Sequence, residues 1–198
     1  MKKVLLIYLI LIAGILIWYY GVGKEKRIFD DANGKALKVS KHSPVFNESM
    51  EDIMTNYYKL TSDFVKGDTL AISENADKLI MALDSLKIDE LKKDSSIFET
   101  AFTIWQDTRT ELAGMLSDPS LQARRESFNL FSNELFTLLL TIRYDLGNLY
   151  WMECSSAFGE DTPGNWIGEN EKSVNPYGKQ NCEDLKKTIK PTDSTGKK

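Results

Sequence analysis

Cys154 and Cys182 are the side chains whose chemistry stands out, because they are the only cysteines among 198 residues and they flank a turn-rich segment. In an oxidising compartment such a pair forms a disulfide, which for a loop of nearly thirty residues stabilises a fold by roughly 3 to 4 kcal/mol in the chain-entropy model. As free thiolates they would instead bind a soft metal ion, with Met152 or His42 as a third ligand. We favour the disulfide, since two thiols without a nearby His or Met cluster are a weak metal signature.

Catalytic chemistry has little support in the sequence. His42 is the only histidine, so multi-histidine metal centres are excluded, and nothing in the sequence brings it to Cys154 as the base of a nucleophilic pair. The chain has no Gly-x-Ser-x-Gly elbow, no phosphate loop and no dinucleotide-binding fingerprint. No helix carries the Glu-x-x-His pair of di-iron proteins. We therefore predict no catalytic residues and a protein that is not an enzyme.

Composition indicates one ordinary domain. Hydrophobic residues make up 42% of the chain and charged residues 27%, which is typical of a folded protein. The formal net charge is −4 and the sequence pI is about 5.2. A dedicated nucleic-acid binder needs a basic excess to neutralise phosphates, so nucleic acid is excluded as a partner.

The amino terminus predicts a membrane anchor over residues 1–23. Lys2 and Lys3 precede twenty uncharged residues, 4–23, which as a helix would span the roughly 30 Å hydrocarbon core of a bilayer. A cleaved signal peptide is the alternative, although the apolar run is longer than usual for one. The positive-inside rule gives a near tie, and we choose export because a short basic start precedes the apolar span. The prediction is a single-pass inner-membrane protein with its carboxyl-terminal domain in the periplasm.

After a basic linker over residues 24–44, the sequence predicts an all-α domain, an up-down four-helix bundle over residues 45–150. Apolar residues recur every three or four positions along four stretches, and short polar breaks separate them. Asp68 or Thr69 can cap the second helix, and Asp118-Pro119 is typical of the start of the fourth. We expect no strands. The apolar positions of the last stretch are Phe128, Phe131, Leu135, Leu138, Ile142, Leu146 and Leu149.

Residues 151–185 form a turn-rich segment that we expect to fold back on the bundle as an irregular chain, followed by a flexible tail over residues 186–198. Aromatic residues in such a segment favour a recognition surface. Its expected contact residues are Trp166, Asn175, Pro176 and Tyr177, which would face an envelope protein partner. The alternative is that Trp166 and Tyr177 only pack the segment onto the bundle, and burial of both rings would argue against the interaction surface.

A spaced series of residues runs through this segment: Tyr150, Cys154, Trp166, Asn175-Pro176-Tyr177-Gly178 and Cys182. After a helix with Arg125, Phe128, Ser132 and Leu135, this series resembles the bacterial family labelled domain of unknown function 3347 (DUF3347). In that family a tyrosine, a Cys-Pro-Met step, a tryptophan, an Asn-Pro-Tyr turn and a final Cys-Gly follow the helices. The resemblance covers roughly residues 42–185, and only its carboxyl-terminal motif is specific.

The resemblance implies an exported, mostly helical domain that occurs alone or fused to adaptor subunits of copper and silver efflux pumps. The chain departs from the motif at Cys154-Ser155-Ser156, which lacks the thioether that copper(I) favours, and at Glu183 in place of the final glycine. Met152 does not replace that thioether if the helix continues, because residues two apart on a helix project to nearly opposite sides. We therefore predict a non-catalytic binding or interaction module without a cofactor, with copper binding or delivery as the alternative.

Overall fold

A computed structural model of the chain describes residues 41–191. The expected membrane anchor, residues 1–23, and most of the expected linker lie outside this range. Among the described residues no helix is both long and apolar enough to cross a membrane.

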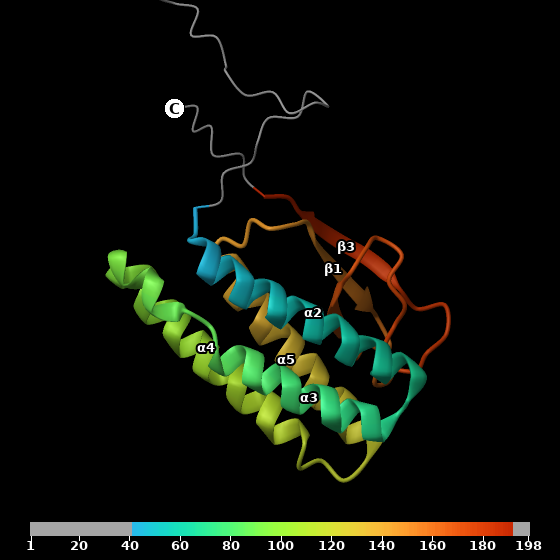
Figure 1. Ribbon diagram of the computed structural model, residues 1–198. Helices are drawn as coiled ribbons and strands as arrows, with labels where there is room; N and C mark the ends of the chain where they lie inside the picture. Colours follow the sequence, from blue (N-terminus) through green and yellow to red (C-terminus); the bar gives the residue numbers. More distant parts are fainter. Residues whose placement is uncertain (1–40, 192–198) are drawn as a thin grey trace, which may run out of the picture. The chain divides into compact units, whose positions relative to one another are not determined.

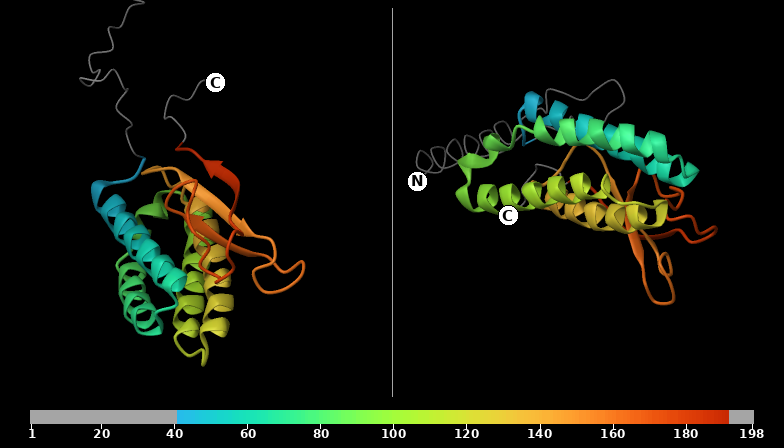
Figure 2. Two further views of the ribbon diagram at one scale, coloured as in Figure 1. Left: turned by 90° about the vertical axis from the view of Figure 1, so that its right-hand side faces the viewer. Right: turned by 90° about the horizontal axis from the view of Figure 1, so that it is seen from below.

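Four α-helices and one short 3-10 helix form the first part of the domain. They are α2 (Pro44–Lys66), α3 (Thr69–Asp84), the 3-10 helix η1 (Ile88–Lys93), α4 (Ser95–Met115) and α5 (Leu121–Thr141). Successive α-helices run in opposite directions (Figure 1), and the pair α2–α3 lies against the pair α4–α5 (Figure 2). The predicted four-helix bundle is confirmed for this part of the chain.

Polar side chains cap the first turns of α2, α3 and α4, at the positions where short polar residues interrupt the apolar pattern. The Ser43 hydroxyl accepts the Phe46 backbone N–H at 3.2 Å, Asp68 accepts from Leu70 and Ala71, and Asp94 accepts from Ile97. Each cap satisfies a backbone donor that has no partner within its own helix. The expected cap at Asp68 is therefore confirmed.

The predicted limits of the fourth helix are wrong at both ends. Ser120, rather than Asp118, is its cap and accepts the Ala123 N–H at 3.1 Å, while the Asp118 carboxylate accepts the hydroxyl of Ser127. The helix ends at Thr141, and two residues later Arg143 has a φ of +59°. A residue with this left-handed backbone conformation cannot continue an α-helix.

The expectation of a purely all-α domain is also wrong, because the carboxyl-terminal part forms a three-stranded antiparallel sheet. The strands are β1 (Leu149–Cys154), β2 (Gly164–Gly168) and β3 (Asp184–Ile189), in the order β2-β1-β3. Residues 151–185 are therefore only partly irregular. The predicted flexible tail over 186–198 overlaps the ordered strand β3, and residues 192–198 lie outside the described range.

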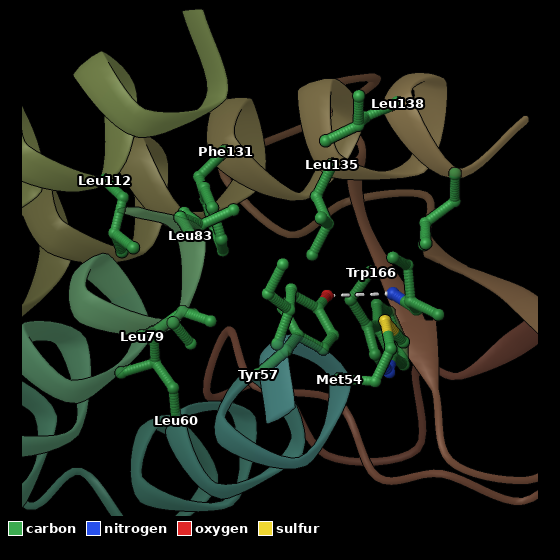
Figure 3. Packing of buried hydrophobic residues seen from close by; sticks show 14 of the residues in the cluster. Met54, Tyr57, Leu60, Leu79, Leu83, Leu112, Phe131, Leu135, Leu138 and Trp166 are labelled. Atoms are coloured by element: carbon green, nitrogen blue, oxygen red, sulfur yellow. Dashed lines mark hydrogen bonds between the residues drawn. The ribbon is translucent and has the colours of Figure 1, made fainter. Parts of the chain in front are cut away.

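The sheet packs on the bundle through the outer edge of β2. The Ile167 backbone N–H donates to the Tyr57 hydroxyl of α2 at 2.9 Å (Figure 3), and the Asn165 N–H donates to Asn129 Oδ1 of α5 at 2.7 Å. Burial raises the pKa of Tyr57 to about 12, so its hydroxyl keeps the proton that it can share with Ser132 Oγ at 3.0 Å. Helix side chains thus satisfy two edge donors of β2 that would otherwise be buried without partners.

Candidate binding site

Cys154 and Cys182 form a disulfide in the structure. The preferred prediction for this pair is therefore confirmed. Cys154 is the last residue of β1, Cys182 lies two residues before β3, and their Cα atoms are 4.9 Å apart. The bond closes the loop that contains β2 onto the central strand of the sheet. It also holds the start of β3, whose residues Asp184–Lys187 are exposed.

Met152 lies on the same face of the sheet as Cys154. A fourth helix that continued through these residues would have placed them on nearly opposite sides. Side chains two apart on a strand share a face, and both residues are buried. Met152 pairs with Trp166 on one side and with Leu185 on the other. In this structure both cysteine sulfurs belong to the disulfide, so neither is present as the thiolate that a soft metal would need.

His42, the other suggested metal ligand, lies just before α2. Its Nδ1 is 3.2 Å from Glu90 Oε1 and its Nε2 is 2.9 Å from the Ile142 carbonyl oxygen. Burial raises the pKa of Glu90, but hydrogen bonds from Ser43 and His42 outweigh that effect and lower it overall. Within residues 41–191, no three His, Cys, Asp or Glu side chains are grouped to hold a metal ion.

The predicted recognition surface is wrong, because its residues are buried. Trp166 is 0% exposed, Asn175 and Tyr177 are each 3% exposed, and Pro176 is buried as well. The Trp166 ring meets the Tyr177 ring edge-on with centroids 5.9 Å apart, and the Tyr177 ring also contacts Phe128 of α5. These aromatic residues therefore hold the carboxyl-terminal segment on the bundle, which is the alternative that the sequence left open.

In the Asn-Pro-Tyr-Gly turn the first three residues are buried, and the polar groups of Asn175 and Tyr177 have hydrogen-bond partners. Asn175 Oδ1 accepts the Tyr177 backbone N–H at 2.8 Å, its Nδ2 donates to the Lys179 carbonyl at 2.9 Å, and the Tyr177 hydroxyl donates to the Asn165 carbonyl. Gly178 has a φ of +83°, and a Cβ there would lie 2.7 Å from Arg125 Nη1. The turn thus needs glycine both for its backbone conformation and for the close approach of Arg125.

Arg125 of α5 connects this turn to α2 and α5 through hydrogen bonds. Its Nε donates to the Pro176 carbonyl at 3.1 Å, and its Nη2 donates to the Phe64 carbonyl near the end of α2 at 3.2 Å. Partial burial lowers the pKa of Arg125, but a guanidinium stays charged at neutral pH. The residues that suggested a family motif thus have structural roles in this fold.

An open surface site lies elsewhere, at the end of the domain where α5 ends, β1 begins and β3 ends. We call this cavity of about 420 Å³ the basic groove. Its apolar lining includes Leu139 and Leu149, which belong to the buried core, and Leu140, which is 42% exposed. The described residues that line it are Lys41, Leu139, Leu140, Arg143, Tyr144, Leu149, Ile189 and Lys190.

The charged residues that line the basic groove are all positive among the described residues. Among residues 41–191, its lining includes the cations Lys41, Arg143 and Lys190 and no carboxylate. Within residues 41–191 the structure shows no ion pair for any of these three side chains. Burial raises the pKa of Tyr144, with a smaller contribution from nearby carboxylates, so this side chain is neutral. The nearby Asp145 accepts the Lys41 backbone N–H at 3.0 Å.

A second groove of about 270 Å³ runs between α2 and the loop after β2. Val65 and Val174 are exposed at its edge, and its charged lining residues are one acid, Glu169, and one base, Lys172. Because these charges balance and most other lining side chains are neutral and polar, this groove has no charge preference for a ligand. The basic groove is therefore the stronger candidate.

Sequence reasoning missed the basic groove because its cations come from three distant places in the chain, residues 41, 143 and 190. No spacing rule connects them, and the sharp turn at Arg143 that brings them together has no glycine to mark it. Comparison of the chain with models of known families, with curated proteins and with solved structures finds no match. The resemblance to DUF3347 therefore stays a prediction.

Proposed function

We propose that this protein is a non-catalytic binding module of the bacterial envelope and that the basic groove is its ligand site. In this proposal residues 4–23 anchor the chain in the inner membrane and the described domain lies in the periplasm. The observation that carries the proposal is the basic groove itself, which combines exposed apolar surface with three cations that form no ion pair within residues 41–191.

Two features of the groove support a ligand site. Its volume of about 420 Å³ falls in the range of small-molecule sites, roughly 300 to 1,000 Å³, and such sites combine an apolar lining with a few polar groups. Its floor is also preformed, because Leu139 and Leu149 belong to the buried core. A preformed floor reduces the ordering cost of binding.

The disulfide supports the proposed compartment. Structural disulfides persist in the periplasm and outside the cell and are rare in the cytosol. With Cys154 bonded to Cys182, an exported domain is the orientation consistent with the chemistry of the pair. The copper alternative requires both thiols to be free, and the disulfide uses both of them.

The test is photolabelling of the full chain in membrane discs that contain diazirine-bearing phosphatidylcholine and phosphatidylglycerol. We expect label to concentrate on peptides containing residues 139–149 and 189–190. Leu140→Trp, which fills the groove, should reduce this labelling about five-fold, since a ring blocks the apolar contacts that an acyl chain would make. Leu130→Trp is the matched control, because Leu130 lies on the same helix, is 54% exposed and does not line the groove.

Equal labelling of these peptides in both tryptophan variants would contradict the proposal, as would labelling no stronger than on other surface peptides. Both variants need an intact disulfide and unchanged helical circular dichroism, so that a loss of label reports the groove rather than the fold.

A further inference from the structure

We propose that the ligand of the basic groove is an acidic phospholipid of the anchoring membrane. Its phosphate would lie among Lys41, Arg143 and Lys190, and the upper part of an acyl chain would lie on the apolar floor. This inference rests on the proposed function and names the ligand class of the same site. It also gives the domain a second attachment to the membrane besides the predicted anchor.

The charge arrangement argues for an anion. The three cations come from three separate elements, namely the residues before α2, after α5 and after β3, and the fold brings them to one cavity. Like charges that share a cavity repel each other, and an anion bound between them offsets this repulsion by attracting each of them. Arginine can hold a phosphate with two parallel hydrogen bonds, and lysine adds point charge. A phosphate diester therefore matches the donors present.

The apolar floor argues against a free phosphate or another small hydrophilic anion. Leu140, which is 42% exposed, and the partly buried Ile189 line the same cavity as the cations, and such an anion would leave their exposed surface uncovered. A neutral lipid would cover the floor but would bring no negative charge to the three cations of the lining. Only a ligand with an anionic head and an apolar chain satisfies both halves of the groove.

The position of the groove argues for a lipid of the membrane itself. Lys41 lines the groove and follows the predicted anchor by eighteen residues, counted from Gly23. The seventeen residues between them can span at most about 60 Å when fully extended, so the groove stays within reach of the bilayer surface. The predicted linker over 24–44 has six basic and three acidic residues, and such an excess favours a surface rich in anionic lipid.

The experiment presents one photoreactive lipid at a time to the full chain in phosphatidylcholine discs. The two lipids, phosphatidylglycerol and phosphatidylcholine, carry the same diazirine chain and differ only in the head group. We expect phosphatidylglycerol to label the peptides with residues 139–149 and 189–190 about five- to ten-fold more than phosphatidylcholine, since each basic residue near an anionic surface strengthens binding several-fold.

The triple variant Lys41→Gln, Arg143→Gln, Lys190→Gln should remove this preference and bring labelling down to the phosphatidylcholine level. The matched control is Lys59→Gln, Lys78→Gln, Lys93→Gln, which removes the same net charge from exposed positions outside the groove and should keep the preference. All three side chains of the test variant are exposed, and retained thermal unfolding of both variants confirms that the fold is intact.

The outcomes separate this inference from the proposed function. Equal labelling by both lipids that Leu140→Trp still reduces would overturn the acidic-lipid assignment and leave the groove as a ligand site. A preference that the control triple variant removes equally well would also overturn it, because the effect would then be general surface charge. Groove peptides that neither lipid labels would contradict both proposals.

Discussion

Replacing Cys154 and Cys182 together by serine is expected to lower the free energy of unfolding by roughly 3 to 4 kcal/mol. The disulfide closes a loop with a sequence separation of 28 residues, and without it the unfolded chain gains the conformational freedom that the bond removes. The folded state loses its covalent link between β1 and the start of the exposed strand β3. Urea unfolding of the full chain, followed by circular dichroism, measures the change.

Reductant provides the control for this prediction. Wild-type protein whose thiols have been released should unfold at the urea concentration of the serine variant, whereas reductant should leave the variant unchanged. If wild-type protein with two titratable thiols unfolds at its original urea concentration, the disulfide does not stabilise this domain as described.

Replacing Trp166 by alanine is expected to cost about 3 to 5 kcal/mol, the range for truncating a large buried aromatic residue. Trp166 is on β2 and is fully buried, and the backbone N–H of the next residue, Ile167, donates to the Tyr57 hydroxyl of α2 (Figure 3). The Trp166 ring contacts the Tyr177 ring. Truncation would leave a cavity between the sheet and the helices, and chemical unfolding of the full chain measures the loss.

Trp151 provides a comparison on the same sheet. It is on β1, is only partly buried and stacks on Phe136 with ring centroids 4.1 Å apart. Because it buries less surface, Trp151→Ala should cost clearly less than Trp166→Ala. Trp166→Phe should also cost less, since Trp166 Nε1 has no hydrogen-bond partner among the described residues and no hydrogen bond is lost. A Trp166→Ala loss no larger than that of Trp151→Ala would contradict the packing of β2 on the bundle.

The helices could be predicted from the sequence because their signals are local. Apolar residues recur at the helical period, and residues such as Asp68 and Asp94 cap the following turn with their own side chains. The strands could not be predicted, because their signals compete with helical ones. Leu146 and Leu149 continue the three-to-four residue spacing of α5, although Arg143 has already ended that helix. Only contacts with β2 and β3 make residues 149–154 a strand.

The short strand β2 could not be predicted because it begins and ends with glycine, which usually indicates a turn. In the fold these glycines are needed for close packing, because a Cβ on Gly164 would lie 2.7 Å from both Ala157 and Tyr177. The disulfide was predictable because two lone cysteines have few other roles in a chain whose amino terminus predicts export. The burial of Trp166 was not predictable, since an aromatic residue in a turn-rich segment has the same sequence pattern on a surface as in a core.

Native mass spectrometry of the full chain, extracted under mild conditions from the cells that produce it, is the sharpest test of a ligand-binding groove. Wild-type protein should carry a non-covalently bound amphiphile, Leu130→Trp should retain it and Leu140→Trp should lose it. Recovery of the bare wild-type chain, or of the same adduct on Leu140→Trp, would show that the groove does not hold such a ligand.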